Sequence, residues 1–333
     1  MSKKITFSII GLVIIILGVV TWNNLSTKPE DSFVEKRIIT FAEGSLTAPC
    51  YPITKVITDV WNKYLPNIIS TPELDPGRLV DNLKNIEEGK FDFRWTMSNL
   101  AFYSYNGLKI EDFKGNSMKS LRTLGSFWNQ ELHLIVSTDS LINDIADFKG
   151  QKVKVVVPSE KAWMAITAKE LFGMHGISPD LVEITSVPLS EIAGSLKAKD
   201  ADIAVLAISI KSTQSKILKK AEGLRFLSLS QEIIKKTTEK LPYYVEGSIP
   251  KNTYPNQTND VSGIIIKGTI VCREDMDSDL VYALTKTMFD HIDEIKEATP
   301  LVKDMFLEAA VTGLAIPLHP GAAKYYTEMG LTP

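Results

Sequence analysis

The sequence predicts an α/β protein with two open α/β lobes joined by two crossing strands. From Arg37 onward, segments rich in branched apolar residues alternate with segments of helical apolar spacing, which is the pattern of an open α/β sheet. The alternation forms two series. One β segment precedes the second series and another, VSGIIIKGTIVCRE (261–274), follows it, so two strands can pass from one lobe to the other.

The first series opens with a strand and a clearly amphipathic helix. Ile53, Val56, Ile57, Val60 and Trp61 recur at the spacing of one helix face. The elements expected here are strand 37–43, helix 50–64, strand 67–72, helix 77–88, strand 92–97 and helix 98–105.

Two adjacent β segments, 121–128 and 132–138, separate the two series. The second series is expected to contain strand 152–157, helix 160–174, strand 181–187, helix 189–197, strand 201–208, helix 211–221, strand 224–229 and helix 230–239. After the long β stretch comes a helix at 278–297, whose apolar face is Val281, Leu284, Met288, Ile292 and Ile295.

Length and composition exclude several classes of protein. With 333 residues, of which 44% are apolar, the chain can form two full cores. A net charge of −3 and the lack of a Lys/Arg block argue against a nucleic-acid surface. Cys50 and Cys272 are the only cysteines, so the chain has no disulfide framework, and a single bridge between them stays open.

The N-terminus carries a hydrophobic segment. Ile5 to Trp22 contains no charged residue, and at ~1.5 Å per residue it approaches the thickness of the hydrocarbon core of a bilayer. Lys3 and Lys4 favour a cytoplasmic N-terminus and export of the remainder to the periplasm or the outer face of the cytoplasmic membrane. We expect an uncleaved anchor at 5–22, with a removed signal peptide as the alternative, and a linker to residue 33.

Five loops at strand ends are expected to converge on one cleft. Gly44 to Pro49 joins a strand to a helix, and the N–H groups at such a helix start suit a carboxylate or phosphate. The loops at the other strand ends are 71–78, 97–99, 158–163 and 209–212. Ligands of open α/β sheets bind outside the carboxyl ends of the strands, so these segments predict an interlobe ligand site.

Four segments carry a family resemblance: SNLAFYSYNG (98–107), LPYYVEGSIPKNTYPNQTNDV (241–261), DLVYALTKTMFDHIDEI (279–295) and GLAIPLHPGAAKYYTEMGL (313–331). Through them the chain, from about residue 37 to its end, resembles the solute-binding subunit of a TAXI-type TRAP transporter. Such tripartite ATP-independent systems import organic solutes with the energy of an ion gradient. The run Ile316-Pro-Leu-His-Pro-Gly321, followed by paired tyrosines, is the most specific of these matches.

This resemblance implies a bilobed periplasmic binding protein of type II. Residues 1–33 are then the anchor or signal peptide plus linker, residues 34–137 and 257–333 form lobe I, and residues 138–256 form lobe II. The resemblance also implies that ligand carboxylates or amides are held by the first strand-to-helix loop, by the segment after the third strand and by a loop of the second lobe. No cofactor is expected, and no metal either, since the sequence has no zinc-ligand spacing.

The correspondence with the family is uneven along these loops. Met97-Ser98-Asn99 stands where the family has Gln-Ser-Asp, and Pro158 to Trp163 replaces Pro-Gly-Ser-Gly-Thr-Glu. The lost glycines would have let the backbone approach a ligand closely, so the ligand can differ from the usual one. The expected ligand contacts are Gly44, Ser45, Thr47, Tyr51, Arg78, Ser98, Asn99, Ser159, Lys161, Trp163 and Ser209.

Several of these candidates also have a purely structural interpretation. Ser45 and Ser98 can cap helices as well as contact a ligand. Arg78 can grip a carboxylate through two parallel hydrogen bonds, or it can lie in solvent on the first turn of its helix. Trp163 is either a stacking platform or part of a core.

Two further features have mainly structural interpretations. Tyr243 and Tyr244 either line the mouth of the cleft or cover the hinge. His319 has no second histidine or cysteine at metal-ligand spacing, so a structural hydrogen-bonding role is expected.

These features predict a binding protein that captures a small organic acid or an amino acid, such as a dicarboxylate, a keto acid or a glutamate-like molecule. The protein would deliver it to a TRAP membrane permease. An enzyme is not expected, because the chain has no Gly-x-Ser-x-Gly, His-Glu-x-x-His or phosphate-binding glycine motif. The alternative is a membrane-anchored sensor or assembly protein that keeps the scaffold without transport, which the altered 158–163 loop favours.

Overall fold

A single mixed β-sheet organises the part of the chain that the structure describes. The structure is a computed structural model that describes residues 36–331 except 47, 78, 159–162 and 304. Its ten strands are β1 (Arg37–Glu43), β2 (Ile68–Leu74), β3 (Phe93–Met97), β4 (Leu121–Ser137), β5 (Val153–Pro158), β6 (Val182–Val187), β7 (Ile203–Ile208), β8 (Leu224–Phe226), β9 (Tyr244–Ile249) and β10 (Val261–Arg273). They follow the order β2-β1-β3-β10-β4-β7-β5-β6, with β8 paired to β4 and β9 paired to β10. The described residues from Ile38 onward form one compact unit. No helix of the described residues is long and apolar enough to cross a membrane, and the predicted segment 5–22 lies outside them.

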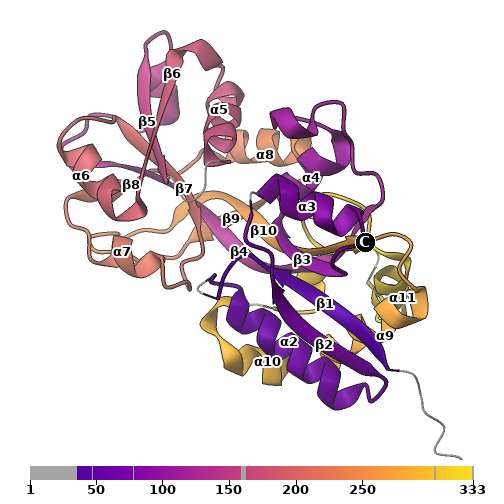
Figure 1. The fold of residues 1–333 in the computed structure, drawn as a ribbon. Coiled ribbons are helices and arrows are strands. Elements are labelled where there is room, and N and C mark those ends of the chain that lie inside the picture. The colour runs from indigo at the N-terminus through magenta and orange to yellow at the C-terminus, as the bar shows by residue number, and fades with distance from the viewer. Residues whose placement is uncertain (1–35, 47, 78, 159–162, 304, 332–333) are drawn as a thin grey trace, which may run out of the picture. The chain divides into compact units, whose positions relative to one another are not determined.

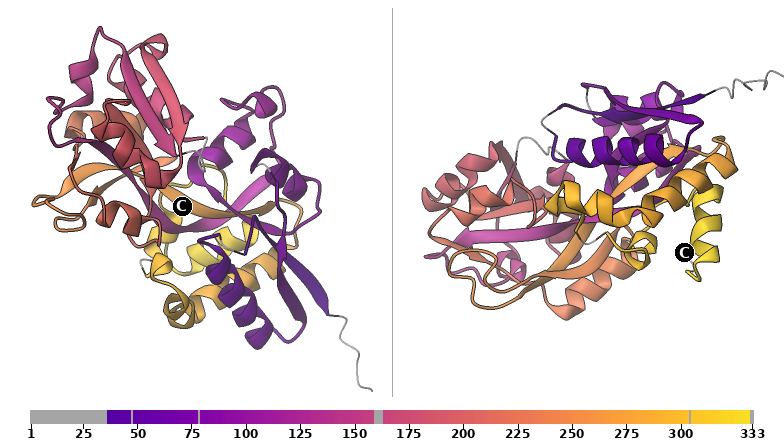
Figure 2. Two further views of the ribbon diagram at one scale, coloured as in Figure 1. Left: turned by 60° about the vertical axis from the view of Figure 1, so that its left-hand side comes forward. Right: turned by 90° about the horizontal axis from the view of Figure 1, so that it is seen from below.

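The first lobe lies at one end of the sheet. Its strands are β1 (Arg37–Glu43), β2 (Ile68–Leu74) and β3 (Phe93–Met97), and its helices are α2 (Tyr51–Tyr64), α3 (Leu79–Glu87), α4 (Ser98–Asn106), α9 (Ser278–Asp290), α10 (Ile292–Ala298) and α11 (Pro320–Glu328). Helix α2 lies against α9 and α10 (Figure 2). The Trp61 indole N–H donates to the carbonyl of Leu284 at 3.0 Å, which fixes α2 on α9.

The second lobe lies at the other end of the sheet. It contains β5 (Val153–Pro158), α5 (Met164–Met174), β6 (Val182–Val187), α6 (Ile192–Lys197), β7 (Ile203–Ile208), α7 (Ser215–Lys219), β8 (Leu224–Phe226) and α8 (Gln231–Lys240). Strand β5 pairs in parallel with both β6 and β7. Strand β7 is buried along its whole length, as expected of a strand covered on both faces.

Two long strands connect the lobes. β4 (Leu121–Ser137) and β10 (Val261–Arg273) are antiparallel neighbours that pass from one lobe to the other, and β9 (Tyr244–Ile249) pairs with β10 (Figure 1). The two predicted β segments at 121–128 and 132–138 are therefore one continuous strand. The polar residues between them, Asn129 to Glu131, pair with Ile265 to Lys267 of β10, so tertiary pairing overrides their low strand propensity.

Other elements also differ from the sequence expectation. The predicted helix at 278–297 is two helices, because the backbone at His291 leaves helical geometry with φ −118° and ψ 30°. Helix α7 and strand β8 are shorter than expected, and β9 and α11 were not foreseen. Proline at the start of α11 is a good helix starter, and it follows His319, whose side chain caps the helix.

One hydrophobic cluster crosses the boundary between the lobes. It joins Leu100 and Tyr103 of α4 to Met164, Leu171 and Phe172 of α5, and all five side chains are almost completely buried. Two more clusters lie within the individual lobes. The lobe boundaries expected from the sequence stay a prediction, because both lobes share one sheet and this cluster.

His319 has a structural role at the start of α11. Its Nδ1 accepts the N–H of Gly321 at 3.1 Å, so the proton lies on Nε2, which donates to the carbonyl of Met276 at 3.1 Å. Burial lowers the pKa of this histidine. Protonation would remove the Nδ1 acceptor and with it the helix cap.

Replacing His319 with alanine is expected to lower the free energy of unfolding by about 2 kcal/mol, because a cap and a buried hydrogen bond are both lost. In the wild type the unfolded chain binds the proton more readily than the folded chain. The stability that depends on neutral His319 is therefore complete above about pH 6.5 and declines below it. Urea unfolding at about pH 7.5 and 5.5 should show a smaller acid loss in the variant. An equal loss would contradict this role.

Candidate functional site

Two adjoining pockets lie between the lobes. The arginine pocket, of about 400 Å³, is lined by Glu43, Gly77, Asn82, Arg94, Trp95 and Thr96 of the first lobe and by Trp163 of the second. The serine pocket, of about 500 Å³, is lined by Ser45, Pro49, Ser209, Ser212, Gln214 and Leu301. Both pockets share Ala48, Cys50, Met97, Trp128 and Gln130, so together they form one cleft over the middle of β4.

Arg94 is the main cationic feature of the arginine pocket. It lies on β3, its side chain is only 9% exposed, and its Nη1 donates to Oδ2 of Asp75 at 3.1 Å. Asp75 is itself held by the amides of Asn82 and Asn85, at 2.7 and 3.0 Å. The bond to Asp75 fixes one edge of the guanidinium of a residue that lines the pocket.

Three residues that line this pocket each have a buried polar atom with no hydrogen-bond partner among the described residues. These atoms are Nε of Arg94, Oδ1 of Asn82 and Oγ1 of Thr96. Native structures leave few such atoms, because each unpaired buried group costs about 1–3 kcal/mol. The Arg94 atom is a donor, the Asn82 atom is an acceptor and the hydroxyl can be either.

Glu43 places a carboxyl group on the same wall. It is 2% exposed, accepts hydrogen bonds from Thr54 Oγ1 and from Cys50 Sγ, the latter at 3.2 Å, and lies at the carboxyl end of β1. Burial raises the pKa of this carboxyl, against the opposing effect of these donors and of Arg94. The Trp95 indole donates to Thr54 at 2.7 Å and completes the network.

Cys50 is a protonated thiol in this network. Burial, followed by the charge of Glu43, raises its pKa well above the usual value, so the thiol donates to Glu43 and is a poor nucleophile. Cys50 and Cys272 are both free. The bridge that the sequence left open is therefore not formed.

The serine pocket has a hydroxyl-rich turn on its second-lobe side. Ser212 donates its N–H and its hydroxyl to the carbonyl of Ser209, at 2.9 and 2.7 Å. The N–H of Ile210 donates to Glu131 Oε2 at 3.0 Å, which ties the turn to β4. The turn therefore holds Ser209 and Ser212 at the edge of the crossing strand.

The structure brings four of the predicted contact residues to the cleft. Gly44 and Trp163 line the arginine pocket, and Ser45 and Ser209 line the serine pocket. Tyr51, the first residue of α2, is half-buried and lines neither pocket. Four predicted residues, Thr47, Arg78, Ser159 and Lys161, lie outside the described residues. The ligand contacts themselves stay predictions.

Ser98 and Asn99 lie at the start of α4 and line neither pocket. The Ser98 hydroxyl donates to the carbonyl of Tyr243 at 2.7 Å and accepts the N–H of Lys267 at 3.1 Å. Asn99 Nδ2 donates to Thr167 Oγ1 of α5 at 3.4 Å. In this structure their bonds join α4 to the crossing strand and to the second lobe.

Sequence reasoning missed Arg94, Glu43, Trp128 and Gln130. A signal was present in FDFRWTM (91–97), where a charged residue interrupts an aromatic strand. An arginine that is buried in a strand needs a partner or a ligand, and this need could have singled it out. No group of three or more His, Cys, Asp or Glu suited to a metal ion occurs among the described residues.

Two lobes on one sheet, two connecting strands and a cleft lined from both sides define the class of bilobed binding-protein folds. The solved structures that resemble this one agree. A TctC solute binding protein from Polaromonas, solved with no ligand, is 12% identical, with a TM-score of 0.53 over 82% of this chain and 88% of that one. XAC2383 from Xanthomonas citri, solved with bound ATP, is 10% identical, with a TM-score of 0.52 over 88% and 95%.

The predicted bilobed type II periplasmic-binding-protein fold is thereby confirmed. The chain belongs to the NMT1-like family, whose model matches residues 41–330. The resemblance to TAXI-type subunits in particular stays a prediction.

Proposed function

We propose that the protein is the extracytoplasmic solute-binding subunit of a TAXI-type TRAP transporter. It captures a small solute in the interlobe cleft without changing it chemically and delivers it to a membrane permease. The observation that carries this proposal is a set of buried, unpaired polar atoms in residues that line the arginine pocket, one of them in a guanidinium that Asp75 already orients. The volume of each pocket lies in the range usual for small-molecule sites.

The solute is a small organic acid or an amino acid. A ligand carboxylate can accept from Nε of Arg94, and an ammonium or hydroxyl group can donate to Oδ1 of Asn82 or to Glu43. The rings of Trp95, Trp128 and Trp163 line the same pocket and can cover an apolar body. Amino acids therefore fit the charges of this pocket as well as simple organic acids do.

The proposed location is the periplasm or the outer face of the cytoplasmic membrane. The uncharged segment at 5–22 acts as an anchor or as a signal peptide. A gene for a fused TRAP permease beside this one would support transport over the sensor alternative.

A thermal-shift screen of the full chain against dicarboxylates, keto acids and amino acids tests the proposal. A true solute at about 100 times its Kd should raise the melting temperature by about 5 °C, because it binds only the folded state. The amide or ester of each compound that stabilises the protein serves as its control, because it lacks the negative charge of the carboxylate. If no acid in the panel stabilises the protein, or if the amides and esters do so equally, an anion-recognising cleft is ruled out.

A further inference from the structure

A buried carboxylate joins helix α5 of the second lobe to the first lobe. Glu170 of α5 has a side chain that is only 6% exposed, and it accepts hydrogen bonds from three tyrosine hydroxyls. Tyr103 of α4 donates at 2.7 Å, Tyr243 at 2.8 Å and Tyr244 at 2.9 Å. Lys109 lies 3.5 Å away, at the exposed edge of this cluster.

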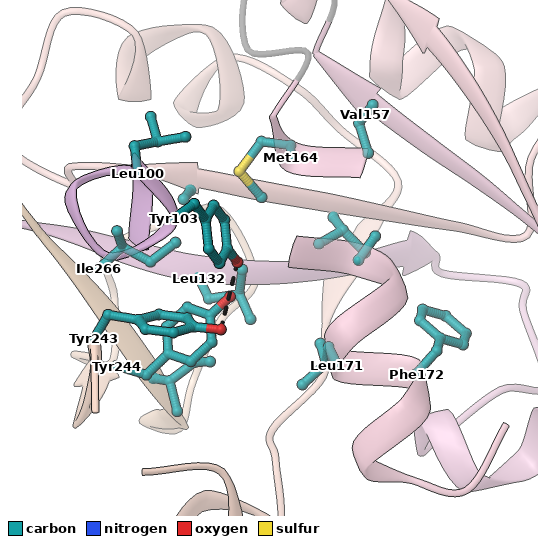
Figure 3. Packing of buried hydrophobic residues seen from close by; sticks show 14 of the residues in the cluster. Leu100, Tyr103, Leu132, Val157, Met164, Leu171, Phe172, Tyr243, Tyr244 and Ile266 are labelled. Atoms are coloured by element: carbon teal, nitrogen blue, oxygen red, sulfur yellow. Dashed lines mark hydrogen bonds between the residues drawn. The ribbon is translucent and has the colours of Figure 1, made fainter. Parts of the chain in front are cut away.

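The three tyrosines are fixed on the side of the first lobe and the crossing strands. Tyr103 and Tyr243 lie against each other between Leu100 of α4 and the start of β9 (Figure 3). The carbonyl of Tyr243 accepts from Ser98, which in turn accepts from the β10 backbone. Glu170 is therefore the group that reaches across from the second lobe.

The surroundings make this contact strong. Tyr103, Tyr243 and Tyr244 are at most 3% exposed, and burial raises the pKa of each hydroxyl, so all three remain donors. Hydrogen bonds to a charged acceptor are stronger than neutral ones, especially where water is excluded. Separating α4 from α5 would expose this carboxylate together with Leu100 and Met164, which pack in the same cluster.

We infer that Glu170 is a positioning residue that holds the second lobe closed on the first in the absence of solute. Trp163 lies at the start of the same helix, so this contact also keeps Trp163 over the arginine pocket. Only this consequence for solute binding rests on the proposed function. A protein that is already closed loses less affinity to conformational change, because the apparent Kd equals the intrinsic Kd divided by the closed fraction.

The test measures the distance between the lobes without any solute. Spin labels are attached to cysteines that replace Lys55 of the first lobe and Lys152 of the second, whose side chains are 60% and 72% exposed. The full chain is kept in detergent micelles, and Cys50→Ser in every sample avoids a third label. Double electron–electron resonance then compares the parent with Tyr103→Phe and Glu170→Gln.

The matched control is Tyr282→Phe. It removes a tyrosine hydroxyl that donates to Glu328 at 2.6 Å within the first lobe, away from the contact between α4 and α5. We expect one short distance in the parent and in the control. In Tyr103→Phe and Glu170→Gln the ratio of closed to open molecules should fall by about tenfold or more.

Three results would overturn the inference: an open parent, unchanged distances in both variants, or an equal shift in the control. Tyr103→Phe removes a single hydroxyl, so it still decides the question if Glu170→Gln fails to fold. The distance measurement does not depend on the solute screen. A screen without a hit therefore leaves the role of Glu170 untouched, and unchanged lobe distances leave the proposal of solute capture untouched.

Discussion

Replacing Arg94 with alanine is expected to weaken the binding of an anionic solute by roughly 100-fold or more, the largest functional effect predicted for this chain. Arg94 lines the arginine pocket, its Nε is unpaired among the described residues, and Asp75 holds its other edge. Truncation removes the ligand's cationic partner. It also leaves Asp75 and Glu43 without their counter-charge, so the variant should be less stable as well.

Arg94→Lys separates these two effects. Lysine keeps the positive charge near Asp75 but cannot form two parallel hydrogen bonds, so we expect near-normal stability and an intermediate affinity. The matched control is Arg122→Ala, which removes an arginine that pairs with Glu274 and lines neither pocket. Isothermal titration with a solute found in the screen measures affinity, and urea unfolding measures stability.

Arg78→Ala belongs in the same series. It compares Arg78, the anion-binding arginine expected from the sequence, with Arg94, the arginine that lines the pocket in the structure. Arg78 lies outside the described residues, so its contribution stays a prediction. If Arg94→Ala and Arg94→Lys fold and bind like the wild type while Arg78→Ala loses binding, the anion site is centred on Arg78, and Arg94 is only a partner of Asp75.

The sequence predicted the fold class because the strand and helix patterns are local. The helix expected at 50–64 is α2 (Tyr51–Tyr64), since its apolar stripe suffices to define it. The loops expected at strand ends do bring Gly44, Ser45, Trp163 and Ser209 to the cleft. Such placement follows from strand direction alone, so it could be predicted without knowledge of any side-chain contact.

The charged wall of the arginine pocket could not be predicted in the same way. Periodicity gives the face on which Arg94 lies, but its partner Asp75 comes from a loop 19 residues earlier in the chain. β4 was divided in two because Asn129 to Glu131 look unlike a strand, and only their pairing with β10 makes them one. Both errors concern residues whose environment is set by contacts that are distant in the sequence.

Gly268→Ala is expected to damage both stability and binding, through the floor of the cleft. Gly268 of β10 is paired with Trp128 of β4, and a Cβ at this glycine would lie 2.2 Å from Cε2 of that indole. Trp128 is 4% exposed and packs on Trp95 with ring centroids 4.3 Å apart, so the indole has little room to move. Overpacking of this kind typically costs about 1–3 kcal/mol.

A methyl group at residue 268 would push the Trp128 indole away from β10, so the loss of stability would be accompanied by a change in the cleft. Trp128 lines both pockets, so an indole pushed away from β10 takes up cleft volume or loses contact with the solute. Gly247→Ala is the matched control. Its Cβ would lie 2.1 Å from Cδ1 of Ile265, so it overpacks the neighbouring strand β9 without lining either pocket.

We expect both glycine variants to lower the urea midpoint of unfolding, with the smaller loss in Gly247→Ala, because the end of an isoleucine side chain can rotate away more easily than an indole. Solute affinity should fall about tenfold or more in Gly268→Ala alone, since a displaced wall removes contacts that the solute needs. If Gly268→Ala binds the solute as tightly as Gly247→Ala does, the Trp128 ring is only a core residue and the solute site lies elsewhere in the cleft.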